Sequence, residues 1–160
     1  MEWKTVIKDP LVKNRATTTT QKKDPFCKRI IIIDDEPDIT LTFKATLEDS
    51  NNNTNNSNIK FEVYTYNDPL AALLEFKSDF YDLLLIDINM PYMDGFELCK
   101  KILELDVNVR VCFMTAGEIN TDAAKEVHPL KGIGCFIKKP ISAEQWIINP
   151  LKESLNTHKI

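Results

Sequence analysis

Short runs rich in apolar residues recur along the chain and are separated by segments with helical spacing. The runs fall at 29–33, 60–64, 83–87, 109–114 and 134–138. We expect these five to be strands, because their length suits a strand and a globular helix needs a longer segment. Continuous apolar runs such as 30–33 are typical of strands that are covered on both faces of a sheet.

The segments between the runs predict helices at 38–48, 67–77, 95–105, 120–127 and 142–155. In the first of these, Ile39, Phe43 and Leu47 recur at the i, i+4 and i+8 positions of one helix face. The sequence Asn67-Asp68-Pro69 reads as a helix start, with an Asx cap and a proline in the first turn. Pro150 lies inside the last predicted helix, where an interior proline costs roughly 3 kcal/mol and kinks or breaks the helix.

Five strands alternating with five helices predict an α/β fold with a five-stranded parallel sheet. The crossover connections are expected to be right-handed, with helices on both faces of the sheet. In open sheets of this kind, the functional crevice lies at the carboxyl ends of the strands. The residues that directly follow each strand are therefore the candidates for chemistry.

Two polar tracts interrupt this pattern. Residues 1–27 read as a polar tail or linker before one folded domain at 28–157, because NRATTTTQKKDP has little periodicity. The tract DSNNNTNNSN at 49–58 reads as a solvated loop between two structured segments.

Composition narrows the class of protein. The net charge of −4 gives no reason to expect direct binding of nucleic acid. No apolar run is long enough to span a membrane, and the start MEWKTVIKDP does not resemble a signal peptide. The four cysteines are scattered without a C-x-x-C pair, so we expect small buried side chains in a reducing cytoplasm and no zinc site.

Acidic and basic residues stand where predicted strands end. Asp34 and Asp35 follow the first strand, Asp87 closes the third, Thr115 follows the fourth, and Lys139 follows the fifth. A parallel sheet brings these ends together at one edge, where converging carboxylates need a cation. Oxygen ligands without histidine or cysteine suit Mg²⁺. A magnesium ion and an ammonium group beside a carboxylate favour binding of a phosphoryl group and formation of an aspartyl phosphate.

Each of these residues, taken singly, has an ordinary structural explanation as a solvated turn or a cap at a strand end. Their order and spacing carry more information, in the stretches IIIIDDEPD (30–38), DINMPYMDG (87–95), FMTA (113–116) and FIKKP (136–140). With these motifs the chain resembles a CheY-like receiver domain of a two-component response regulator over about residues 28–157. The resemblance implies a doubly wound, flavodoxin-like sandwich.

The resemblance also implies a role for each matching residue. Asp87 is the expected phosphoryl acceptor. Mg²⁺ is the expected cofactor, held by Asp35 directly, by Asp34 largely through water, by Asp87, and by the backbone carbonyl of Asn89.

Three further residues complete the implied site: Thr115 and Lys139 as catalytic residues, and Thr115 and Phe136 as the switch. Thr115 is expected to bond a phosphoryl oxygen, and Lys139 to pair with another. A cis bond is expected before Pro140, with Lys138 turned to solvent. Phe136 falls at the aromatic switch position.

The implied function is a stand-alone signalling module rather than an ordinary enzyme, one that catalyses only its own phosphorylation and dephosphorylation. It would accept a phosphoryl group from a sensor histidine kinase or phosphotransfer protein and signal to a downstream protein, with a possible homodimer through the last strands and helices.

Two alternatives stay open. One is a pseudo-receiver that binds partners without phosphorylation. The other is a magnesium-dependent phosphohydrolase, although such enzymes usually carry an aspartate where this chain has Asn89.

Overall fold

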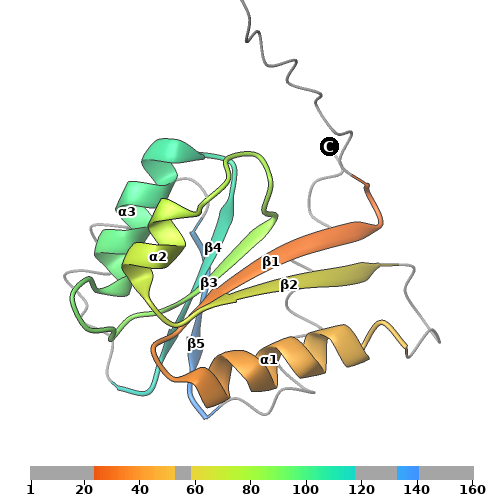
Figure 1. Cartoon of the computed structure of the whole chain (residues 1–160), viewed down its shortest axis with the longest axis horizontal. Helices are drawn as coiled ribbons and strands as arrows, with labels where there is room; N and C mark the ends of the chain where they lie inside the picture. Colours follow the sequence, from red (N-terminus) through yellow and green to blue (C-terminus); the bar gives the residue numbers. More distant parts are fainter. Residues whose placement is uncertain (1–23, 53–58, 118–132, 141–160) are drawn as a thin grey trace, which may run out of the picture.

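A five-stranded parallel sheet forms the centre of the molecule (Figure 1). The computed structural model describes residues 24–52, 59–117 and 133–140. The elements in chain order are β1 (Cys27–Ile33), α1 (Pro37–Asp49), β2 (Lys60–Tyr66), α2 (Pro69–Leu74), β3 (Leu83–Asp87), α3 (Gly95–Leu105), β4 (Arg110–Thr115) and β5 (Ile133–Lys138). The strand order is β2-β1-β3-β4-β5, and every neighbouring pair is parallel. The predicted α/β fold with a parallel sheet is confirmed.

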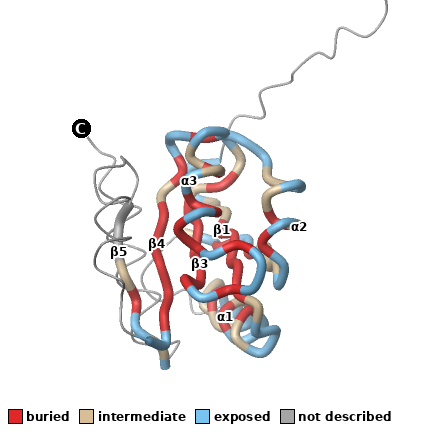
Figure 2. Tube along the Cα trace, turned by 90° about the vertical axis from the view of Figure 1, so that its left-hand side faces the viewer, coloured by how far each residue is buried: buried red, intermediate tan, exposed pale blue. Residues whose placement is uncertain are grey.

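Two apolar layers enclose the sheet. Helices α2 and α3 cover one face, and α1 lies on the opposite face (Figure 1). Residues 30–33 of β1 have no exposed surface, because their side chains alternate between the two layers. Figure 2 shows the same burial along the neighbouring strands β3 and β4. The continuous apolar runs in the sequence thus have the predicted cause, which is burial on both faces.

The start of α2 follows the predicted capping chemistry. The Asp68 carboxylate accepts hydrogen bonds from the backbone N–H groups of Leu70 and Ala71, at 2.8 and 3.5 Å, and Pro69 begins α2. Asp94 caps α3 in the same way through the N–H of Glu97, at 2.8 Å. Each cap satisfies donors that have no partner within the helix.

Element ends are where sequence and structure differ. Helix α2 ends at Leu74, three residues before the predicted end, because Phe76 leaves the helix to pack on the Tyr81 ring at 5.3 Å. Strand β2 continues two residues further than predicted, to Tyr66, whose carbonyl accepts from the Asp34 N–H at 3.1 Å. The predicted helices at 120–127 and 142–155, and with them Pro150, lie outside the described residues.

The cysteines are only partly as expected. Cys99 is a buried free thiol, and burial raises its pKa to about 12. Cys112 is also buried, but it is disulfide-bonded, so the expectation of reduced thiols throughout is wrong. Scattered spacing along the chain could not reveal this, because strand register, not sequence distance, decides which cysteines meet. Among the described residues, no helix combines the length and apolar character needed to cross a membrane.

Candidate active site

The residues predicted at strand ends converge at one edge of the sheet. Asp34 directly follows β1, Asp87 closes β3, and Thr115 closes β4. The parallel register places Asp87 beside Met114 and Thr115 beside Lys138, which precedes Lys139. The structure therefore brings together side chains that are more than a hundred residues apart in the chain, from Asp34 to Lys139.

Lys139 is the cation at the centre of this edge. Its Nζ lies 2.6 Å from Asp34 Oδ2 and 2.9 Å from Asp87 Oδ1. Only 9% of its side chain is exposed, so water screens these ion pairs weakly. A third acid, Glu36, approaches the same ammonium at 3.5 Å from the solvent side. Lys138 is exposed, as predicted.

The two buried aspartates divide their oxygens between the loop and the crevice. Asp34 Oδ1 accepts a hydrogen bond from the Glu36 N–H at 3.0 Å, and Asp87 Oδ2 accepts one from the Asn89 N–H at 2.8 Å. The remaining oxygen of each carboxylate points to Lys139. The local loops thus fix both carboxylates and leave one oxygen of each for chemistry in the crevice.

The charge at this edge is not balanced. Asp34, Asp35 and Asp87 each offer an oxygen, and these atoms all lie within 4.8 Å of one another. Asp34 Oδ2 is fully buried and accepts no well-directed hydrogen bond, since its short contact with Lys139 is an ion pair without hydrogen-bond alignment. Three carboxylates against one ammonium leave room for a hard cation with oxygen ligands, and the donor set fits Mg²⁺.

Burial dominates the protonation chemistry of the site. Removal from water raises the pKa of Asp34 above its ordinary value, and the bonds from Lys139 and from the Glu36 N–H oppose this only in part. The pKa of Asp87 is raised for the same first reason, with Lys139 again opposing. Burial alone would lower the pKa of Lys139, but its bonds to the two aspartates prevail and raise it. The carboxylates are therefore under-compensated, which again favours a second cation.

A glycine allows the loop after β3 to close on the aspartate. A Cβ atom at Gly95 would lie 2.3 Å from the Asp87 carbonyl oxygen, a distance that no side chain tolerates. The Gly95 N–H donates to the Ile88 carbonyl at 2.9 Å and ties the start of α3 to the strand end. The glycine of DINMPYMDG is thus required by close backbone approach.

Thr115 and Phe136 lie on the two strands that border the crevice. The buried Thr115 hydroxyl accepts from the Gly117 N–H at 3.1 Å and lies 3.5 Å from the Asn89 side-chain amide. The Thr115 carbonyl accepts from the Lys139 N–H at 2.7 Å. Phe136 is partly exposed and stacks on Phe113, with ring centroids 5.4 Å apart. The bond between Lys139 and Pro140 is cis, as predicted.

Two contributors to the site were not predicted from the sequence. Glu36, within the motif IIIIDDEPD, had no predicted role, yet its carboxylate lies 3.5 Å from Lys139 Nζ. Asn67 was assigned to a helix start, but its amide donates to the Asp34 carbonyl at 2.7 Å and to Thr40 Oγ1 at 3.1 Å. No sequence signal links Asn67 to Asp34, because the contact arises from the pairing of β1 with β2.

Known proteins with similar sequences are signalling proteins and transcriptional regulators. The chain is 33% identical over 116 residues to the sensor protein EvgS of Escherichia coli K12, covering 72% of this chain and 9% of EvgS. It is 27% identical over 119 residues to the transcriptional regulatory protein TrcR of Mycobacterium tuberculosis, covering 74% of this chain and 42% of TrcR. The chain therefore spans less than half of each of these relatives.

Solved structures share the fold. A CheY-like response regulator receiver domain protein from Methanospirillum hungatei superposes with a TM-score of 0.64 at 25% identity, over 82% of this chain and 95% of that one. The non-phosphorylated HemR receiver domain from Leptospira biflexa gives a TM-score of 0.67 at 22% identity, over 81% and 94%. Residues 30–149 match the family described as the response regulator receiver domain. The chain thus belongs to the receiver-domain family of two-component response regulators.

Proposed function

We propose that this chain accepts a phosphoryl group on Asp87 and, in response, changes conformation to signal to a partner protein. Receiver domains are signalling domains that typically bind Mg²⁺ and interact with sensor kinases and downstream effectors. One observation carries the proposal for this chain. Asp87 Oδ1 is directed into a crevice where Lys139 Nζ lies 2.9 Å away and where Asp34 and Asp35 add negative charge.

The transfer proceeds by attack of an Asp87 oxygen on the phosphorus of a phosphohistidine in a donor protein. The new O–P bond forms as the N–P bond breaks, and the histidine nitrogen keeps the bonding electron pair and takes up a proton. Asp87 is held for this attack by the Asn89 N–H at 2.8 Å. Lys139 offsets the charge that accumulates on the phosphoryl oxygens, since its Nζ already contacts the acceptor.

Magnesium fits the remaining acids. Asp34, Asp35 and Asp87, with the backbone carbonyl of Asn89, would hold it, since one oxygen of each carboxylate lies within 4.8 Å of the others. When bound, the ion supplies positive charge for the transferred group. Lys139 then no longer has to neutralise Asp34 and Asp87 alone, so its ammonium becomes available to the phosphoryl group.

The switch uses Thr115 and Phe136. A phosphoryl group on Asp87 adds charge and acceptor oxygens next to the Thr115 hydroxyl, which here accepts from the Gly117 N–H at 3.1 Å. Turning this hydroxyl toward the phosphoryl group draws the segment after β4 inward. The stacked ring of Phe136 then changes its packing on Phe113, and the surface around β4 and β5 changes with it.

Intact mass spectrometry tests the proposal directly. The protein is incubated with Mg²⁺ and acetyl phosphate, beside an Asp87→Asn variant, a chelated sample and an Asp94→Asn control whose carboxylate only caps α3. We expect one added phosphoryl group in wild type and Asp94→Asn, and none in Asp87→Asn or without metal. A phosphoryl adduct that still forms in Asp87→Asn would contradict the assignment of Asp87 as the acceptor.

The two alternatives predict other results. A pseudo-receiver shows no adduct, and a beryllofluoride titration leaves the NMR signals of Thr115 and Gly117 unmoved. A phosphohydrolase releases phosphate with many turnovers. The chemistry of Asn89 supports the signalling proposal over a phosphohydrolase, because its amide cannot act as a general acid and its N–H holds Asp87.

A further inference from the structure

The outer edge of β2 is closed by one side chain from the middle of α1 and one from the turn that follows the helix. The Asn51 side chain forms a pair of hydrogen bonds with the backbone of Phe61: it donates to the carbonyl at 3.0 Å and accepts from the N–H at 2.8 Å. Lys44 Nζ donates to the Val63 carbonyl at 2.6 Å and is held by Glu48 at 2.8 Å. We call Asn51 and Lys44 the edge clamp.

These bonds occupy the positions at which a further strand would pair. Among the strands that the structure describes, β2 lies at the end of the sheet and pairs with β1 alone. Lys60 N–H and the Tyr66 carbonyl face β1 and its flanks, bonding Phe26 O at 2.7 Å and the Asp34 N–H at 3.1 Å. Because backbone groups alternate along a strand, those of Phe61, Val63 and Thr65 face outward. An unpaired edge of this kind is a template for another chain.

The Asn51 amide reproduces the bonds that a neighbouring strand's peptide group would make. It offers one donor and one acceptor to one residue of β2, as a paired strand does. An open groove with a volume of about 410 Å³ runs beside it and is lined by the edge clamp, Glu48 and residues 61–64. The groove and the clamp together lie where an added strand would have to enter.

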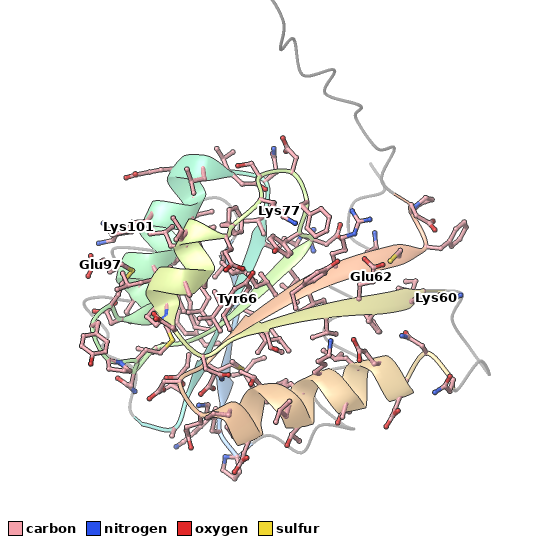
Figure 3. The ribbon with its side chains drawn as sticks, viewed as in Figure 1. Lys60, Glu62, Tyr66, Lys77, Glu97 and Lys101 are labelled. Atoms are coloured by element: carbon pink, nitrogen blue, oxygen red, sulfur yellow. The ribbon has the colours of Figure 1, made fainter. Side chains whose placement is uncertain are left out.

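The composition of β2 makes self-pairing favourable once the edge is open. The strand KFEVYTY is rich in aromatic and β-branched residues. In an antiparallel pair of two copies centred on Val63, Lys60 faces Tyr66 and Glu62 faces Tyr64, so no like charges are opposed. Lys60 and Glu62 can be followed along the strand in Figure 3.

We propose that the edge clamp keeps the molecule from assembling through β2 by blocking antiparallel pairing with the β2 strand of a second copy. This gives Asn51, the first asparagine of the tract at 49–58, a defined structural role. The proposal is independent of phosphorylation, because the clamp lies away from the residues of the candidate active site.

The test is the oligomeric state of an Asn51→Ala/Lys44→Met double variant by sedimentation velocity over a hundredfold range of concentration. We expect wild type to keep one sedimentation coefficient, and the double variant to shift to dimers or larger species as concentration rises. The matched control is Asn52→Ala/Lys101→Met, which removes the same groups from an exposed asparagine and from a lysine of α3 that pairs with Glu97, as Lys44 pairs with Glu48.

A third variant identifies the surface involved. Thr65→Pro, added to the double variant, removes one outward N–H and leaves the bonds to β1 in place. We expect it to restore the concentration-independent sedimentation of wild type. Far-UV circular dichroism reports that each variant is folded. Asn51→Asp, which keeps only the acceptor, serves if the double variant does not fold.

Two results would overturn the proposal. The first is sedimentation of the double variant, or of Asn51→Asp in its place, that stays independent of concentration. The second is assembly that also occurs in the control or that survives Thr65→Pro, because it would then use another surface. Assembly confined to the clamp variants and removed by Thr65→Pro supports it.

Discussion

Buried aspartates lie at both ends of the sheet, but their surroundings differ. Asp106, before β4 at the amino end, is 5% exposed, and its two oxygens accept from the N–H groups of Asp79 and Asn108, each at 2.9 Å. Asp34 and Asp87, at the carboxyl end, each accept one backbone N–H and share a single ammonium through the other oxygen. Burial of an acid therefore does not mark a functional site. What marks the functional site is a buried carboxylate oxygen that accepts no hydrogen bond from a neutral donor.

The largest effect that tests this comparison is expected at the amino end. Asp106→Ala leaves two backbone N–H groups without acceptors, so we expect the free energy of unfolding to fall by about 2–4 kcal/mol in urea denaturation. The exposed Asp49→Ala is the control and should change it by less than about 0.5 kcal/mol. Asp106→Ala should still be labelled by acetyl phosphate where it is folded. Loss of labelling in the folded variant would contradict a purely structural role.

The next effect concerns the rigidity of the carboxyl end. Gly95→Ala forces a Cβ atom against the Asp87 carbonyl, with a separation of 2.3 Å before relaxation. We expect a loss of about 1–3 kcal/mol in stability and slower labelling of Asp87, because the strand end must move. Gly117→Ala is the matched control, since its Cβ would meet atoms only at 4.0 Å. Equal free energies of unfolding for Gly95→Ala and Gly117→Ala would contradict a tight backbone contact at Gly95.

A smaller change of opposite sign is expected at Asp34. Asp34→Asn removes a charge that burial disfavours, so at neutral pH without metal we expect the free energy of unfolding to rise. Mg²⁺ affinity, measured by calorimetry, should fall in the same variant. Destabilisation by Asp34→Asn would show that its pairing with Lys139 outweighs its burial.

The pH dependence of that gain follows from the direction of the pKa shift. Burial, opposed by Lys139, leaves the folded-state pKa of Asp34 raised above 3.8. The cost of its charge is therefore fully present above the raised pKa and disappears as the pH falls through it towards 3.8. The stability difference between wild type and Asp34→Asn should shrink over this window in urea titrations. A difference that grows on acidification would contradict the direction of the shift.

The smallest effect is expected at the two non-glycine residues that have a positive φ in the described part of the molecule. Tyr92, in the loop after β3, has a φ of 69° and is 92% exposed, whereas Asp79, at the amino end, has a φ of 59°. Aspartate and asparagine tolerate this conformation better than tyrosine. We expect Tyr92→Asn to stabilise by about 0.5–1 kcal/mol and Asp79→Asn to change little, both by thermal denaturation. Equal changes in stability at the two positions would contradict the expected difference between tyrosine and aspartate in this backbone conformation.

Much of the fold follows from the sequence because its strands are buried on both faces. Residues 30–33 and 83–86 can occupy no other place in a small domain, and the caps at Asp68 and Asp94 act within a few residues of themselves. Element ends are less predictable. The last turn of α2 was lost to aromatic packing between Phe76 and Tyr81, which local propensity does not contain.

The candidate site divides in a similar way. The order of Asp34, Asp87, Thr115 and Lys139 along the chain, together with their family motifs, was sufficient to place them at one edge. Their assigned roles stay predictions until phosphorylation is measured. The contacts of Glu36 with Lys139 and of Asn67 with Asp34 were not predictable, since each depends on strand pairing and loop geometry.

The sequence by itself determined the parallel α/β architecture and the set of acidic and basic groups at its carboxyl edge, because hydrophobic periodicity and strand-end position are local properties. Only the tertiary structure decided how the charges are shared, which carboxylate oxygens pair with Lys139, and how Asn51 closes the edge of β2. Hydrogen bonds and ion pairs act over a few ångströms in space. Whether two groups come that close depends on the packing of the whole chain.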